Sequence, residues 1–256
     1  MALMVYDHLH TLPMEIRYMW SSRRLTIVNV LYYITKYGIL FSVADLYRVF
    51  NRSMTVQECQ YTAYIYSILT LTSWAGEAVL GIRIWAIWGK KRILTIALPI
   101  IFWALFTTDF VFILNYIGSL EYGPSPAPQL ISCFVTKANN NMDVILVCMP
   151  AWVALMSILL TTSAYLAYKS GGNTRFIRMI YQEGIIYYFY LLLLHGGNLV
   201  ITYRASAPPP VVASFLSGPV CFLHVALASR VILHIRKQAN MRLHATDHVR
   251  DEEIWT

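Results

Sequence analysis

Charged side chains are scarce in this sequence. Asp, Glu, Lys and Arg together make up 13% of the 256 residues, whereas hydrophobic residues make up 57%, and the mean hydropathy is +0.52. In an average soluble domain, roughly a quarter of the residues are charged. The composition therefore excludes an ordinary soluble protein and indicates a membrane protein.

Sequence motifs of common enzymes are missing as well. The chain has no His-Glu-x-x-His metal site, no Gly-x-Ser-x-Gly nucleophile elbow, no phosphate-binding glycine loop and no paired Cys-x-x-Cys. We therefore expect no enzyme activity, no bound metal and no cofactor. An intramembrane hydrolase is the alternative that the sequence leaves open.

Acidic residues are fewer than basic ones, 13 against 20, which gives a formal net charge of +7. A nucleic-acid-binding protein would need these basic residues on a soluble face with aromatic or motif support. Here every basic cluster borders an apolar run, so we expect no nucleic-acid partner. The expected partner is the lipid bilayer, whose anionic head groups attract basic residues at a membrane border.

Long apolar runs fill most of the chain, each near or above the roughly 20 residues that a helix needs to cross a bilayer. They are continuously apolar, which favours helices over the alternating strands of a barrel. Residues 1–12 are apolar too, but as a helix they are only about 18 Å long and cannot span. The six complete runs are Thr26–Phe50, Tyr61–Trp88, Ile93–Ile117, Met142–Tyr168, Gly184–Tyr203 and Val211–Ile235.

These runs predict an all-α polytopic transmembrane helix bundle with six complete spans and a partial N-terminal helix. We expect a single bundle domain over residues 1–235 and a short polar tail over residues 236–256. Short cytoplasmic loops carry the excess of Lys and Arg, so the side with more basic residues is expected to be cytoplasmic, together with the C-terminus. That side holds Arg17, Arg23, Arg24, Lys90, Lys91, Arg92, Lys169, Arg175, Arg178, Arg236, Lys237, Arg242 and Arg250.

Cysteines are few, and two of the four fall on the predicted outer side. Only the pairing of Cys59 with Cys133 places both thiols in an oxidising compartment, which favours a disulfide there. The alternative is two unpaired cysteines. On the same side Asn51 begins an Asn-Arg-Ser glycosylation sequon, close to the expected membrane surface.

Four ionisable residues are predicted to lie near the bilayer midplane. At 1.5 Å of rise per residue, Lys36, Glu77, His195 and His224 each lie about 15–16 Å from the cytoplasmic boundary. Because a lone charge at this depth costs several kcal/mol, we expect Lys36 to pair with Glu77. Neutralisation of both groups is the alternative.

This mid-membrane layer has two interpretations that the sequence leaves open. It forms a ligand pocket or proton path, or it is a buried bridge that fixes the helices in register. Gly196, Gly197 and Asn198, next to His195, suit either tight helix packing or room for a small ligand. Asp109, toward the outer end of its run, is expected to be solvated at the membrane interface.

Several stretches of the sequence carry a family resemblance. The chain opens with "YDHLHTLPMEIRYMW" followed by "VLYYITKYG", and further stretches are "LGIRIWAIWGKKRIL", "FIRMIYQEGIIYYFYLLLLHGGNLV" and "ALASRVILHIR". Together they resemble a family of fungal, chiefly basidiomycete, multi-pass membrane proteins that is defined by a domain of unknown function. Members have a complete apolar helix that ends at the Tyr-Asp of the opening motif, so the resemblance implies that this sequence is shortened by about half a helix.

A complete first helix would give seven spans, an outer N-terminus and a cytoplasmic C-terminus, which is receptor topology. The sequence has no Asp-Arg-Tyr triplet at Arg83 and no Asn-Pro-x-x-Tyr motif, and topology alone does not confer function. A receptor-like sensor in the plasma membrane or secretory pathway, with an unknown small ligand or cytoplasmic signalling partner, is the leading hypothesis. The alternative is a transporter or channel that uses the mid-membrane layer.

Overall fold

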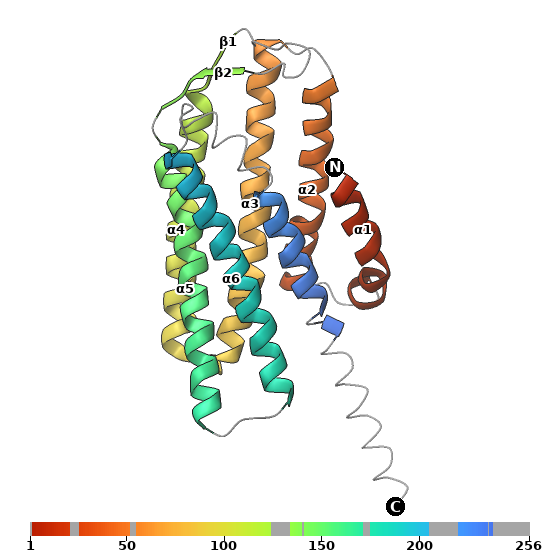
Figure 1. The fold of residues 1–256 in the computed structure, drawn as a ribbon, viewed down its shortest axis with the longest axis vertical. Coiled ribbons are helices and arrows are strands. Elements are labelled where there is room, and N and C mark those ends of the chain that lie inside the picture. The colour runs from red at the N-terminus through yellow and green to blue at the C-terminus, as the bar shows by residue number, and fades with distance from the viewer. Residues whose placement is uncertain are drawn as a thin grey trace, which may run out of the picture.

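The structure, a computed structural model, describes residues 2–20, 26–51, 55–123, 134–139, 141–170, 175–204, 220–234 and 236–237. The described chain is a helical bundle with one small sheet, so the prediction of an all-α fold is confirmed (Figure 1). Its elements are α1 (Ala2–Glu15), a π-helical turn η1 (Ile16–Trp20), α2 (Ile27–Asn51), α3 (Val56–Ile87), α4 (Arg92–Gly118), β1 (Glu121–Gly123), β2 (Phe134–Lys137), α5 (Met142–Lys169), α6 (Arg175–Arg204) and a last helix (Val220–His234).

Local sequence signals set both ends of α3. At its start Thr55 and Glu58 form a capping box, in which the Thr55 side chain accepts from the Glu58 amide and the Glu58 carboxylate accepts from the Thr55 amide at 2.8 Å. At its end, Gly89 and Lys90 adopt positive φ angles of 64° and 55°. This left-handed turn reverses the chain, so α4 runs back antiparallel to α3.

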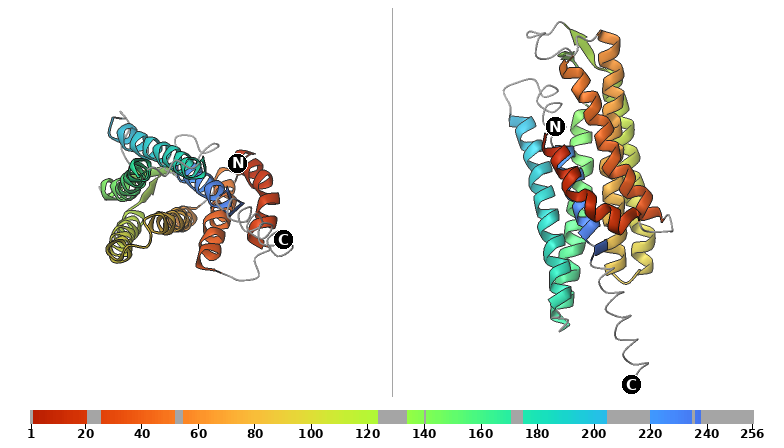
Figure 2. Two further views of the ribbon diagram at one scale, coloured as in Figure 1. Left: turned by 90° about the horizontal axis from the view of Figure 1, so that it is seen from below. Right: turned by 90° about the vertical axis from the view of Figure 1, so that its right-hand side faces the viewer.

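Helix α3 lies at the centre of the fold and packs against α2, α4 and α5, while α5 also packs against α6. The last helix lies between α6 and the pair formed by α1 and α2 (Figure 2). Both α1 and the described part of the last helix are shorter than α3 and α6 and lie beside the middle part of the bundle (Figure 1). The last helix is therefore placed to contact side chains from several neighbouring helices.

The two ends of the bundle differ in chemistry. At one end, which we call the hairpin end, β1 and β2 pair in an antiparallel ladder beside the start of α3 (Figure 1). Burial of Tyr122 in this ladder, with Tyr116 nearby, raises the pKa of Tyr122 to about 12, so its hydroxyl stays neutral. The opposite end, which we call the basic end, carries the α3–α4 turn with Lys90, Lys91 and Arg92.

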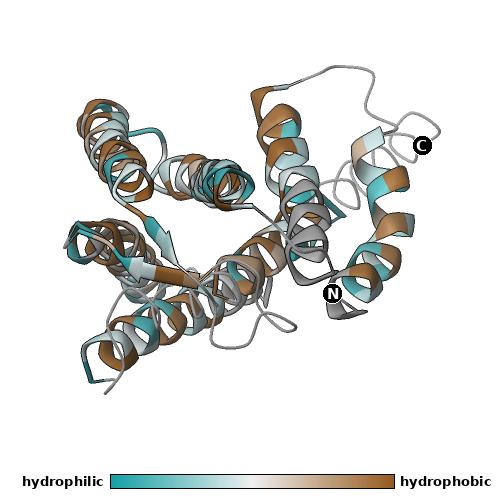
Figure 3. Ribbon diagram, turned by 90° about the horizontal axis from the view of Figure 1, so that it is seen from above, coloured by the Kyte–Doolittle hydropathy of each residue, from teal (hydrophilic) through white to brown (hydrophobic). Residues whose placement is uncertain are grey.

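Hydrophobic residues lie on the outward-facing sides of the helices as well as on their inner sides, as the colours of Figure 3 show from the hairpin end. Inside, the core centres on large side chains from α3 and α5 such as Trp74 and Trp152, each 1% exposed. Outside, α4 exposes Ile93, Ile96 and Ile100 by more than half. A helix that is hydrophobic on all faces is stable in lipid and not in water.

Four helices of the described chain are long and apolar enough to cross a membrane, namely α3, α4, Asp143–Lys169 of α5 and Gly184–Arg204 of α6. Shorter apolar helices, Ile27–Leu40 and Val220–His234, lie beside them. These features are those of an integral membrane protein. The predicted count of six spans and a partial helix stays a prediction.

Candidate functional site

The predicted mid-membrane residues all lie inside the bundle, but they form two separate networks. Lys36 on α2 is 3% exposed and Glu77 on α3 is completely buried. His224 on the last helix is also completely buried, and His195 on α6 is 9% exposed. All four side chains are thus buried, but they do not all contact one another.

The prediction that Lys36 pairs with Glu77 is wrong. The Lys36 ammonium forms an ion pair with Glu15 of α1, with Nζ 3.0 Å from Oε2, and donates a hydrogen bond to Thr11. Glu15 is completely buried. The physical reason is the packing of α1 against α2, which gives Lys36 a carboxylate partner nearer than α3 can supply.

Glu15 has further donors that hold it in place. Tyr37 of α2 donates to Glu15 Oε1 at 2.7 Å, and Trp20 of η1 donates to the same oxygen at 3.3 Å. We call Thr11, Glu15, Trp20, Lys36 and Tyr37 the Lys36 network. Hydrogen bonds of this kind support a buried ion pair, so this network holds α1 onto α2.

The sequence contains a signal for this network that the predictions missed. Asp7, Thr11 and Glu15 are spaced four residues apart, which places three polar side chains on one face of a helix. Asp7 uses this face to contact the last helix, where Arg230 donates to it with Nε 2.6 Å from Oδ1. Because the segment as a whole is apolar, its composition alone does not reveal this polar face.

Glu77 lies in the second network, at the meeting point of four helices. Trp152 of α5 donates to Glu77 Oε2 at 3.0 Å, and His224 Nε2 of the last helix lies 3.3 Å from Glu77 Oε1. His224 Nδ1 in turn lies 3.3 Å from His195 Nε2 of α6. We call these four residues the Glu77 network.

His224 joins the Glu77 network through both of its ring nitrogens. Its Nδ1 shares a hydrogen bond with His195 Nε2, while its Nε2 lies 3.3 Å from Glu77 Oε1 without hydrogen-bond geometry. When His195 Nε2 is the donor in the first contact, the proton of a neutral His224 is on Nε2 and faces Glu77. That arrangement leaves His195 Nδ1 as the remaining acceptor of the chain. A proton that arrives at His195 can therefore be passed through His224 to Glu77, with each ring nitrogen exchanging its role.

A third buried contact joins α3 to α4. Trp74 Nε1 donates to Asp109 Oδ2 at 2.7 Å, and Asp109 is only 2% exposed. The expectation that Asp109 is solvated at the interface is therefore wrong. The indole of Trp74 supplies the polar partner that a buried carboxylate needs.

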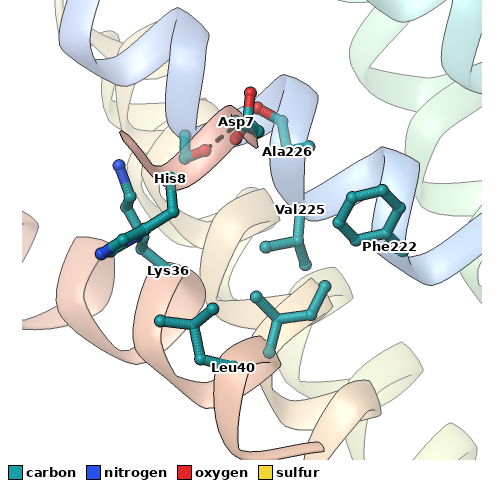
Figure 4. Close-up of a pocket in the computed structure, with 9 residues that line it drawn as sticks. Asp7, His8, Lys36, Leu40, Phe222, Val225 and Ala226 are labelled. Atoms are coloured by element: carbon teal, nitrogen blue, oxygen red, sulfur yellow. Dashed lines mark hydrogen bonds between the residues drawn. The ribbon is translucent and has the colours of Figure 1, made fainter. Parts of the chain in front are cut away.

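A small pocket opens between α1, α2 and the last helix, next to the Lys36 network (Figure 4). Its polar side consists of Asp7, His8, Lys36 and Ser229. Its apolar side is formed by Ile39, Leu40, Phe222, Val225 and Ala226. Asp7 and Lys36 already hold ion-pair partners, so the pocket offers no unbalanced charge to a ligand.

Gly196 and Gly197 follow His195 along α6. A Cβ atom added at either glycine would meet no atom of the described chain within 4 Å. Both glycines are half-buried and lie on the side of α6 away from the buried face of His195 and Asn198, so this space does not decide between tight packing and room for a small ligand. Asn198 is 7% exposed, and its Oδ1 has no hydrogen-bond partner among the described residues.

The remaining predicted sites are only partly described. Cys59 is buried and disulfide-bonded, while its predicted partner Cys133 lies outside the described residues. Asn51 ends α2, and its side chain also lies outside them. Over the described ranges, no group of three His, Cys, Asp or Glu side chains is placed to hold a metal ion.

Residues 1–41 match a family of unknown function, DUF6533. The matched segment contains α1, η1 and the part of α2 that carries Lys36. It therefore includes all of the Lys36 network and none of the Glu77 network. No curated protein matches the chain.

Proposed function

We propose that this integral membrane protein is a receptor-like sensor, in which the Glu77 network couples α3, α5, α6 and the last helix. The observation that carries the proposal is the continuous contact from Glu77 through His224 to His195, with both contacts at 3.3 Å. Glu77, His224 and His195 can each gain or lose a proton or change their hydrogen-bond role. Such a change alters how the helices hold one another, which is what a sensor needs from its bistable element.

In this proposal the bundle is a seven-helix type, with α1 as its first helix and six complete spans after it. The basic end faces the cytoplasm, because the short loops there carry the Lys and Arg excess. The hairpin end faces an oxidising compartment, which agrees with the disulfide-bonded state of Cys59. The protein then resides in the plasma membrane or secretory pathway.

A transporter is the second candidate, and one observation favours it. Asn198 is buried, and its side-chain oxygen has no partner in the described chain. Polar side chains inside a membrane bundle often mark a solute or ion path.

Two measurements on reconstituted protein separate these functions. In nanodiscs, spin labels at Ala86 of α3 and Ile186 of α6, both exposed, report the spacing of the two helices at acidic and alkaline pH. In proteoliposomes, a pH-sensitive dye reports proton flux. A sensor shows two spacings whose populations shift with pH, a shift that Glu77→Gln abolishes, and no flux.

Tyr190→Phe removes a hydroxyl from the exposed side of α6 and should leave both readouts unchanged. Proton flux that disappears in Glu77→Gln would establish the transporter instead. A single spacing at every pH, without flux, would contradict both functions.

A further inference from the structure

The buried polar face of α6 continues beyond His195 toward the hairpin end. Asn198 and Thr202 follow at steps of three and four residues, which keeps all three side chains on one face of the helix. Their exposures are 9% for His195, 7% for Asn198 and 3% for Thr202. At 1.5 Å per residue this polar face extends about 10 Å from His195 to Thr202.

Two oxygens on this face have no hydrogen-bond partner in the described chain, Asn198 Oδ1 and Thr202 Oγ1. Buried polar atoms in folded proteins are nearly always hydrogen-bonded, either to protein or to ordered water. Ordered water is the partner that these two buried oxygens require.

Toward the basic end the same face of α6 is closed. Leu191, one turn before His195, is completely buried, and it packs in the core with Leu80 and Ile84 of α3. Apolar packing of this kind excludes water. The polar face is thus continuous on one side of His195 and interrupted on the other.

We infer that His195, Asn198 and Thr202 line a hydrated path that delivers protons from the hairpin end to the Glu77 network. This inference rests on the proposed function, because it names the proton as the input that the network receives. A proton from the water binds His195 Nδ1, the Nε2 proton of His195 moves to His224 Nδ1, and the Nε2 proton of His224 moves to Glu77. One proton enters, one carboxylate becomes a carboxylic acid, and both imidazoles end neutral.

Other titratable and charged groups lie around this relay on several helices. Between α1 and α2, Lys36 and Glu15 form an ion pair with each other. The groups around the Glu77 network are Arg83 of α3, Asp109 of α4, Cys148 of α5, Tyr187 and Tyr188 of α6, and Cys221 of the last helix.

The test follows the protonation of Glu77 in time. The full chain in lipid nanodiscs is exposed to a rapid drop in pH, and infrared difference spectroscopy records the carboxylic-acid carbonyl band that Glu77→Gln removes. Thr202→Val keeps the shape of the side chain and removes the hydroxyl, and Asn198→Leu removes the amide. Each is expected to slow the appearance of the Glu77 band about tenfold, equivalent to an extra barrier of roughly 1.4 kcal/mol, without changing its final size.

Tyr188→Phe is the matched control, because it removes a buried hydroxyl from α6 on the basic side of His195. Its rate should equal that of the unsubstituted protein. Slowing by Tyr188→Phe in place of Thr202→Val would overturn the inference, since protons would then enter from the basic end. A band that never appears, or that appears equally fast in every variant, would also overturn it.

The spin-label spacing, measured on the same samples, separates this result from the proposed function. If the hairpin-side variants slow protonation but the helix spacing never changes with pH, the path exists and the sensor proposal fails. If the spacing changes with pH while Thr202→Val has no effect on the rate, the sensor proposal stands and the path is wrong.

Discussion

The Lys36 network and the Glu77 network are both buried, yet they solve the problem of a charge in the membrane in different ways. Lys36 meets an opposite charge on Glu15, and Thr11, Tyr37 and Trp20 occupy further hydrogen-bonding positions. Glu77 meets no permanent cation among its described contacts, only the Trp152 indole and the His224 imidazole. The first network is built from fixed charges and the second from groups that can exchange protons.

Helix packing also differs between α2 and α6. Near Lys36, a Cβ atom added at Gly38 would lie 2.2 Å from Thr72 Cγ2 of α3, so α2 and α3 touch closely there. Gly196, next to His195 in the sequence, has no described atom within 4 Å of such a position, because it lies on the half-exposed side of α6. The comparison teaches that burial alone does not distinguish a structural residue from a functional one.

Loss of one charge from the Lys36 network should have the largest effect. Lys36→Met leaves Glu15 buried without its cation, and we expect the free energy of unfolding in detergent to fall by about 3–5 kcal/mol. Thermal unfolding followed by size-exclusion chromatography measures this. The double variant Lys36→Met with Glu15→Leu should recover much of the loss, and a mild effect of Lys36→Met alone would show that the ion pair is dispensable.

Glycine substitutions sharpen the contrast in packing. Gly38→Ala forces α2 away from Thr72, and overpacking of this kind costs about 1–3 kcal/mol. Gly196→Ala is the matched control on α6, and we expect no loss of stability because open space receives the methyl group. Equal melting temperatures for the two variants would remove the distinction between a tight and a roomy region.

Glu77→Gln should change stability by no more than about 1 kcal/mol. The amide oxygen still accepts from Trp152, and no permanent cation loses its partner. The same variant should lose the pH-dependent helix spacing entirely, so function and stability separate at this residue. A loss of stability as large as that of Lys36→Met would instead indicate a structural ion pair at Glu77.

The surface pair of the hairpin should matter least. Lys137 Nζ lies 3.8 Å from Glu121 Oε2, and both side chains are more than half exposed. Exposed pairs of this kind contribute about 0–1 kcal/mol, so Lys137→Ala should leave the melting temperature almost unchanged. A clear drop would show that the β1–β2 ladder supports the bundle more than its size implies.

Helices were predictable from the sequence because their signal is strong and local. The run 93–117 became α4, Arg92–Gly118, and the run 142–168 became α5, Met142–Lys169. The start of α3 was placed late, at Tyr61, because the capping box at Thr55 lies in a polar stretch that the apolar pattern ignores. The β1–β2 ladder was missed because its strands are short and depend on pairing across a loop.

Partners across helices were less predictable. Depth along each helix correctly suggested that Lys36, Glu77, His195 and His224 would be buried, but it could not say which helix faces which. Two residues at the same depth can lie on opposite sides of a bundle. Glu15, the ion-pair partner of Lys36, lies in a segment that is too short to span. A pattern of membrane spans therefore gives no sign that this segment supplies the partner.

A double-mutant cycle on Lys36 tests the division into two networks most directly. Unfolding free energies are measured for Lys36→Met combined with Glu15→Gln, and for Lys36→Met combined with Glu77→Gln, beside the single variants. We predict a coupling energy on the order of 2–3 kcal/mol for Lys36 with Glu15 and less than about 0.5 kcal/mol for Lys36 with Glu77. Strong coupling of Lys36 to Glu77, with none to Glu15, would contradict the account.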